Sequence, residues 1–221
     1  MVAVLGVAGL TGCRSNPTVA AYIGGQQVGQ KSVNSMVDEL TKAVDALPAE
    51  SRSSINLGGL RMLVVQTVVV SDLAGRVAAD RKISVTSLDP AEVAQNFGLP
   101  DSIAKTSWAA ANVRLQSRLS ALASAAPVVE PTEADQREVY GTITVQGQKV
   151  SVPFEKVRPL LDSQHLGKEL GLRGWLVTGV HRYHVVVNPK YASAGYPIAV
   201  TLSDSQADQV AAYLSVPFGS Q

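Results

Sequence analysis

The sequence predicts a mainly helical fold with a few short strands near its two ends. Apolar residues recur at spacings of three and four along several stretches, which is typical of amphipathic helices. One stretch, residues 60–82, is apolar around most of its circumference, as expected for a buried helix. The chain has 221 residues, of which 46% are hydrophobic and 17% charged. This composition is that of an ordinary globular protein with a substantial core.

The first elements after residue 18 are predicted to be a small hairpin and an amphipathic helix. Residues 19–28 hold two short apolar pieces around Gly24-Gly25, which favours a β-hairpin that needs a partner to pack on. Ser32 begins a helix that Pro48 ends, with an apolar stripe of Val33, Met36, Val37, Leu40, Val44 and Leu47. The Ser- and Gly-rich residues 49–59 are interpreted as a loop.

The middle of the chain is predicted to hold three more helices. The apolar run 60–70 is interrupted by Gln66, and we interpret 60–82 as a buried helix rather than a membrane span. Asp89-Pro90 begins a short helix that ends near Gly98, because Asp is a good N-cap and Pro is favoured at the first helical position. A third long helix is predicted from Asp101 to Ala125, with Trp108 and Leu115 on its apolar stripe.

The C-terminal part is predicted to mix helices and short strands. Pro159 should kink one of the helices, since proline removes a backbone donor. In chain order the predicted elements are a helix over 132–140, a hairpin over 142–152, a helix from Phe154, a helical segment over 166–175, a strand over 183–187 and a final helix over 203–214.

An apolar segment at the start, Val2 to Leu10, ends in Leu10-Thr11-Gly12-Cys13 and is followed by polar residues. An apolar run closed by small residues is typical of a secretory signal. Leu-Thr-Gly-Cys resembles a bacterial lipobox, in which the cysteine becomes lipid-modified. Cys13 is the only cysteine, so it has no disulfide partner within the chain. The alternative is an ordinary free cysteine, favoured by the lack of Lys or Arg before it.

This interpretation predicts an extracytoplasmic protein anchored to the cell membrane by a lipid on Cys13. The expected organisation is a signal peptide and lipobox over 1–13, a tether over 14–18 and a single domain over 19–221. Within that domain we expect a helical core over 31–126 and a C-terminal part over 132–221.

Several functional classes find no support in the sequence. A net charge of +1 and 5% aromatic residues give no case for nucleic-acid binding. His181 and His184 fall in the predicted strand or its approach, where a spacing of three places side chains on opposite faces. There is no phosphate-binding glycine loop and no nucleophile elbow. The sequence therefore predicts no catalytic residue, no metal and no cofactor, and favours a protein that is not an enzyme.

The order of the elements resembles a known family. A lipobox is followed by Ala21-Tyr22-Ile23-Gly24-Gly25 and Val28, then by long helices, Pro131-Thr132-Glu133-Ala134-Asp135, and Val185-Val-Val-Asn-Pro-Lys-Tyr191. This arrangement, over most of Cys13–Tyr191, is similar to the SurA N-terminal-like domain of bacterial extracytoplasmic chaperones. It also resembles the PrsA-type lipoprotein foldases.

The resemblance implies a helical domain in which the early hairpin pairs with the strand over 183–187. It implies a lipid-anchored, chaperone-like protein that binds unfolded or newly exported polypeptides. Met62, Trp108 and Leu115 are candidate linings of a client groove, because large adaptable apolar side chains suit varied segments. One alternative is an adaptor lipoprotein that binds a single folded partner. The other is a reduced peptidyl-prolyl isomerase, although residues 132–182 carry no recognisable parvulin pattern.

Overall fold

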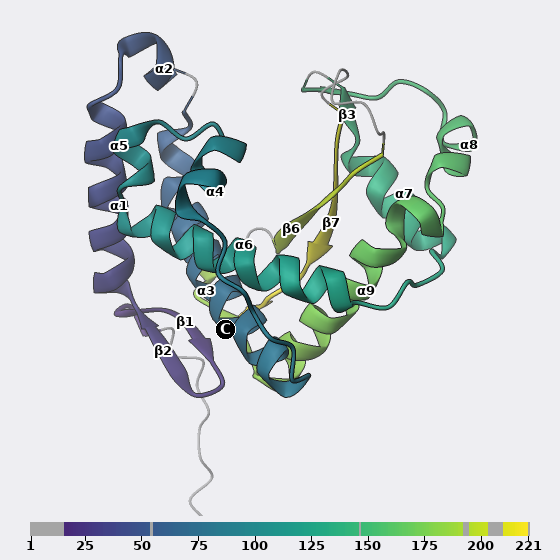
Figure 1. The fold of residues 1–221 in the computed structure, drawn as a ribbon, viewed down its shortest axis with the longest axis horizontal. Coiled ribbons are helices and arrows are strands. Elements are labelled where there is room, and N and C mark those ends of the chain that lie inside the picture. The colour runs from purple at the N-terminus through teal and green to yellow at the C-terminus, as the bar shows by residue number, and fades with distance from the viewer. Residues whose placement is uncertain (1–15, 54, 146, 192–194, 203–209, 221) are drawn as a thin grey trace, which may run out of the picture.

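The helices of this protein cross at the base of a V, with a small sheet at the base and a second sheet in one arm (Figure 1). The computed structural model describes residues 16–53, 55–145, 147–191, 195–202 and 210–220. Helices dominate, and strands from the two ends of the chain form a small sheet. The predicted fold class is therefore confirmed.

The first sheet joins the start of the described chain to its end. Strand β1 (Val19–Ile23) turns at Gly24-Gly25 into β2 (Gln26–Gly29), and the two form the predicted hairpin. Both glycines have positive φ, 55° and 82°, the conformation that a two-residue hairpin turn requires. β1 also pairs with β5 (Val186–Val187), and β5 pairs with β8 (Gly219–Ser220).

The pairing of β1 with β5 confirms the contact that the resemblance implied. The predicted strand over 183–187 is too long, however, because helix α9 continues to Arg182 and only two residues are extended. Asn188 follows β5 and is hydrogen-bonded to β1. Its backbone N–H donates to Ala20 O at 2.9 Å, and its side-chain amide donates to Val19 O at 3.2 Å.

The first helix packs its predicted stripe inward. Helix α1 (Gln30–Asp45) begins two residues before the predicted Ser32 and buries Val33, Val37, Leu40 and Val44. The predicted loop over 49–59 is not wholly irregular, since it holds α2 (Ala49–Ser53) and a 3-10 turn, η1 (Leu57–Gly59). Gln30 anchors the helix start, because its amide nitrogen lies 2.6 Å from the hydroxyl of Tyr191.

Helix α3 (Leu60–Asp80) is the central element, as the apolar circumference predicts. It contacts α1, α6, α9 and β1, and eleven of its residues are buried. By length and composition alone, Leu57–Asp80 would also suffice to cross a membrane, and 56% of its most apolar window is buried in this fold. The predicted burial of this helix is confirmed.

The third long helix of the prediction is two helices. Asp89 accepts a hydrogen bond from Ala91 N at 2.8 Å and begins α4 (Pro90–Asn96), as expected. α5 (Asp101–Ala104) then ends after one turn, and α6 (Ser107–Ala125) starts afresh. Thr106 is the N-cap of α6, because its hydroxyl accepts a hydrogen bond from Ala109 N.

The segment after residue 131 largely follows the prediction. α7 (Glu133–Thr142) has the full Thr132–Asp135 capping box, and the expected hairpin is reduced to β3 (Thr144–Val145) and β4 (Gln148–Lys149). α8 (Phe154–Val157) gives way to a 3-10 turn, η2 (Arg158–Leu160), which contains Pro159. The long helix α9 is Ser163–Arg182. Pro189–Tyr191 forms a last 3-10 turn, η3.

The predicted final helix over 203–214 is wrong where the structure describes it. Residues 203–209 lie outside the described residues, and Val210–Val216 form strand β7. Residues 212–216 of β7 pair with β6 (Tyr196–Val200), a strand that the sequence did not predict. Ala212, Leu214 and Val216 alternate toward the core, so the period of two prevails over the helical pattern. The second sheet has the order β4-β3-β7-β6.

The molecule has two lobes joined where α3, α6 and α9 cross (Figure 1). The helical lobe consists of α1, α2, α4 and α5 with the first halves of α3 and α6. The sheet lobe consists of α7, α8, α9 and the sheet β4-β3-β7-β6.

Two glycines of α9 offer a matched test of this packing. A Cβ at Gly171 would overlap the carbonyl oxygen of Pro127, a backbone atom that cannot move aside, whereas nothing lies within 4 Å of a Cβ at Gly174. We expect Gly171→Ala to lower the free energy of unfolding, at or above the upper end of the ~1–3 kcal/mol typical of overpacking.

The control, Gly174→Ala, should raise the free energy of unfolding by about 0.5–1 kcal/mol, because alanine is the better helix former. Urea titrations followed by circular dichroism measure both. Equal stabilities of the two variants would contradict the close approach of α9 to Pro127.

Candidate functional site

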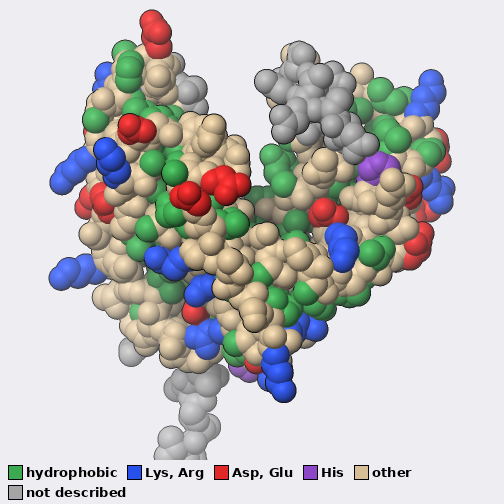
Figure 2. All heavy atoms as spheres, viewed as in Figure 1, with side chains coloured by type: hydrophobic (Ala, Val, Ile, Leu, Met, Phe, Trp, Pro, Cys, Tyr) green, Lys and Arg blue, Asp and Glu red, His purple; other side chains and the backbone are tan. Residues whose placement is uncertain are grey.

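A cleft separates the two lobes, and the space-filling view shows it as a deep hollow (Figure 2). Helix α6 crosses its base in the ribbon view (Figure 1). Gln66 of α3 joins the lobes there, since its side-chain amide donates to Gly195 O, next to β6, at 3.1 Å. The cleft therefore has a floor supplied by the crossing helices and a wall from each lobe.

The helical lobe contains an apolar pocket of about 430 Å³. Its walls come from the stripe of α1, the start of α3, the α4–α5 connection and the start of α6. The residues that line it are Leu40, Val44, Leu47, Ser51, Ile55, Leu60, Leu63, Gly98, Leu99, Pro100, Ile103 and Trp108. None of them is charged, so the pocket suits an apolar occupant.

Local sequence features hold these walls in place. Gly98, with φ of 58°, ends α4 and turns the chain so that Leu99 and Pro100 face α1. Ser102 donates to Ala43 O of α1 at 3.0 Å. Ser107 contacts Glu39 of α1 twice, through its backbone N–H at 3.1 Å and through its hydroxyl. α5 and the start of α6 are thus bound to α1 by hydrogen bonds.

Trp108 is fixed at the back of the pocket by a hydrogen bond. Its indole N–H donates to Thr67 Oγ1 of α3 at 3.1 Å, and the Thr67 hydroxyl donates onward to Leu63 O at 2.8 Å. The indole is only 7% exposed, and its polar atom is satisfied. Trp108 is therefore a rigid wall rather than a mobile side chain.

Large apolar side chains are exposed around this pocket. Leu63 lines it and is 39% exposed, Leu57 precedes its lining residue Leu60 by one turn and is 51% exposed, and Phe97 precedes Gly98 and is 53% exposed. Exposed apolar residues scattered singly are ordinary, but a group beside an apolar pocket is typical of a binding surface.

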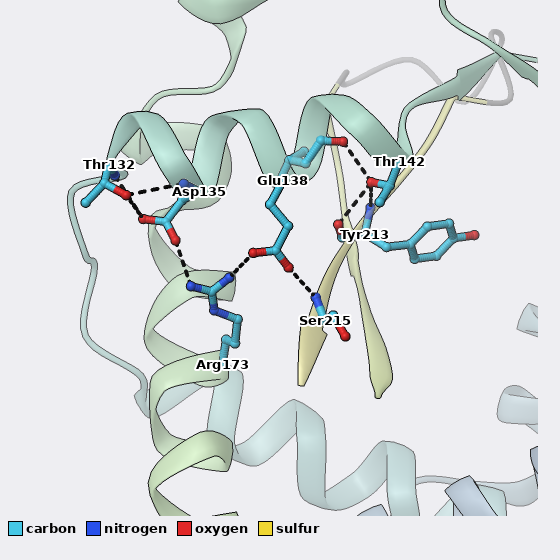
Figure 3. Close-up of polar contacts among 8 residues, drawn as sticks. Thr132, Asp135, Glu138, Thr142, Arg173, Tyr213 and Ser215 are labelled. Atoms are coloured by element: carbon cyan, nitrogen blue, oxygen red, sulfur yellow. Dashed lines mark hydrogen bonds and ion pairs between the residues drawn. The ribbon is translucent and has the colours of Figure 1, made fainter. Parts of the chain in front are cut away.

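The sheet lobe presents an open sheet face. Ile198 and Leu214 pair across β6 and β7 and are buried toward α9, while the next pair, Ala199 and Tyr213, is exposed. Tyr213 points away from α7 and α9 in the close-up (Figure 3). Pro197 and Ser215 extend this exposed face.

A polar network locks β7 to the helices behind it (Figure 3). Arg173 of α9 donates to Asp135 Oδ1 and to Glu138 Oε2 of α7, both at 2.7 Å. Glu138 in turn accepts from Ser215 N at 2.9 Å, and Thr142 Oγ1 accepts from Tyr213 N at 2.9 Å. Side chains of α7 thus satisfy the backbone groups of β7 beyond the short β3, which protects the edge of the sheet.

The electrostatics of this network indicate a structural role. Burial is the largest influence on Asp135 and raises its pKa. Hydrogen bonds from Thr132 and the hydrogen bond and charge of Arg173 together outweigh burial and hold that pKa below its usual value. Asp135 therefore stays ionised at neutral pH. A carboxylate held this way is suited to pairing with Arg173 rather than to transferring protons.

Of the three residues predicted to line a client groove, one lines the apolar pocket. Trp108 lines the apolar pocket, whereas Met62 and Leu115 are not among its lining residues. Leu115 is 2% exposed within the core, and Met62 is partly buried one turn before Gln66 on α3. Cys13 lies outside the described residues. Other residues that line the pocket include Leu40, Val44 and Leu47. The sequence analysis predicted these residues only as part of the apolar stripe of the first helix.

The histidines also depart from the predicted geometry. His181 lies in the last turn of α9 rather than in a strand, and His184 follows with a positive φ of 45°. Within the ranges that the structure describes, no three His, Cys, Asp or Glu side chains are grouped closely enough to hold a metal ion.

Comparisons of this chain with protein-family models, with curated proteins and with solved structures gave no match.

The Arg173 network leads to a stability prediction. Arg173→Gln leaves Asp135 and Glu138 as facing carboxylates without their cation, and Asp135 is only 15% exposed. We expect a loss of about 2–4 kcal/mol in the free energy of unfolding, because removing one partner of a largely buried pair leaves charge uncompensated. Urea titration at pH 7 measures it.

The matched control is Arg158→Gln. Arg158 is 3.9 Å from Glu155, and both side chains are about half exposed or more. Its removal should change the free energy of unfolding by less than about 0.5 kcal/mol. A similar loss from both variants would mean that the Arg173 network is no stronger than a surface pair.

A pH titration tests Asp135 directly. Because its pKa is lower in the folded than in the unfolded chain, its stabilising effect is present above the unfolded value and is lost as pH falls through the folded value. The free energy of unfolding should therefore decline as pH is lowered below about 4. In Asp135→Asn this decline should be shallower. Identical slopes for the two proteins would show that Asp135 is not specially stabilised as a carboxylate.

Proposed function

We propose that this protein is a chaperone-like factor that binds unfolded or newly exported polypeptides through apolar side chains. The observation that carries the proposal is the uncharged pocket of about 430 Å³, with exposed Leu63 in its lining and exposed Leu57 and Phe97 close to its lining residues in the chain. Side chains of an extended polypeptide are the occupants that fit, because a pocket without charged groups selects for apolar character and little else.

The arrangement of the lobes supports the same proposal. An extended chain lying in the cleft meets the helical lobe on one side and the open face of β6 and β7 on the other (Figure 2). That face carries small side chains and Tyr213, which suits segments of varied sequence. Binding of this kind is non-covalent and uses shape and burial, without a catalytic group.

The proposal includes a location outside the cytoplasmic membrane, with the chain held there by a lipid on Cys13. The Leu10-Thr11-Gly12-Cys13 motif is what supports it. A single acyl chain binds membranes only marginally, so a stable anchor uses more than one. Such an anchor places the cleft close to the point at which exported polypeptides emerge.

The first test is suppression of aggregation of a chemically unfolded client by the purified chain. We expect dose-dependent suppression at near-stoichiometric amounts. Leu63→Gln should raise the amount needed about fivefold to tenfold, because it places a polar amide where an apolar side chain binds.

The matched control is Leu160→Gln, since Leu160 is also exposed, at 51%, and lies in the sheet lobe away from the pocket. It should suppress aggregation as well as the wild type. No suppression by the wild type overturns the chaperone proposal and favours the adaptor alternative. Equal loss in the two variants places binding elsewhere.

A further inference from the structure

A second pocket, also of about 430 Å³, lies between α3 and α6 and is separate from the apolar pocket. Three small residues of α3, Gly75, Ala78 and Ala79, line one side, and two arginines of α6, Arg114 and Arg118, line another. Because these side chains are small, they leave a volume in which the guanidinium groups can contact a ligand.

The connection between α3 and α4 borders this pocket through Ile83, Val85 and Ser87. It crosses α6 in the ribbon view (Figure 1), and it is fixed there because Leu88 N donates to the hydroxyl of Ser117 at 3.0 Å. That hydroxyl donates in turn to Val113 O at 2.8 Å. Ile83 and Val85 of the connection supply the apolar part of the lining.

Arg118 is held in a defined position. Its Nη1 donates to Ser71 O at 2.5 Å and lies 3.1 Å from the Ser71 hydroxyl. The guanidinium rests on Gly75, where an added Cβ would come within 2.9 Å of Cζ. The absence of a side chain at Gly75 is thus what lets the guanidinium lie flat against α3. Arg114 is one turn earlier on the same side of α6 and is exposed.

Neither arginine has a carboxylate partner among the residues that the structure describes, whereas Arg76, Arg137 and Arg173 each pair with one. Two like charges four residues apart on a helix repel each other, so this pair costs stability unless an anion binds between them. Guanidinium groups hold carboxylate and phosphate oxygens through paired, charge-assisted hydrogen bonds.

We propose that this pocket binds an oxyanion, a carboxylate or a phosphate, carried on a small apolar body. Arg114 and Arg118 bind the oxygens, and the apolar body lies against Ile83 and Val85. The site is independent of the polypeptide-binding proposal, because it shares no lining residue with the apolar pocket.

Isothermal titration calorimetry on the full chain tests it with three probes: phenyl phosphate, benzoate and neutral benzyl alcohol. At least one of the two anions should bind with a Kd of millimolar or lower. Benzyl alcohol should bind at least about tenfold more weakly. Arg114→Gln should weaken the anion about tenfold or more, because it removes charge-assisted hydrogen bonds. Since Arg114 is exposed, this variant should keep its fold.

Arg61→Gln is the control, because Arg61 is an exposed arginine at the opposite end of α3, where it donates to Asn34. It should bind the anion as the wild type does. Absence of binding by both anions up to several millimolar overturns the proposal. So does an anion affinity that Arg114→Gln leaves unchanged, or one that Arg61→Gln lowers equally. None of these outcomes depends on the aggregation assay.

Discussion

The burial of α3 is the constraint on which the other elements depend. This helix is apolar on most sides, and it contacts α1, α6, α9 and β1 at once. Three of its polar side chains then hold neighbouring elements in place through hydrogen bonds. Gln66 binds the backbone beside β6, Thr67 accepts the indole N–H of Trp108, and Ser71 accepts the guanidinium of Arg118. Two turns of one helix thus position the sheet lobe, the apolar pocket and the arginine-lined pocket.

The two lobes are stabilised by different means. The sheet lobe has a short second sheet whose central strand is held by Arg173 and the side chains of α7, so its open face is fixed. The pocket of the helical lobe lies between the long helices α1, α3 and α6, and part of its wall comes from the four-residue helix α5 and the connection that precedes it. Short helices have few internal contacts, which suits a surface that adapts to varied apolar segments.

Features set by neighbours in the chain were predictable from the sequence, and features set by distant partners were not. The Gly24-Gly25 hairpin, the Thr132–Asp135 capping box and the burial of α3 all follow from local patterns. The predicted final helix is wrong over residues 210–214, because β7 is defined by its pairing with Tyr196–Val200, which a local pattern does not reveal. Trp108 was predictable as a candidate lining residue because it lies on the apolar stripe of its own helix. The residues of α1 and of the α4–α5 connection that line the pocket with it were not predictable, because they are distant in the chain.

We propose that an unfolded polypeptide binds the helical lobe at its exposed apolar residues Leu57, Leu63 and Phe97. Site-specific photocrosslinking tests it most directly, with a photoreactive phenylalanine analogue placed at Phe97 and, in a second protein, at Leu160 of the sheet lobe. Both positions are about half exposed, so they sample solvent equally. We expect crosslinks to an unfolded client from position 97, and few from position 160. Equal yields from the two positions, or crosslinks only from position 160, would contradict it.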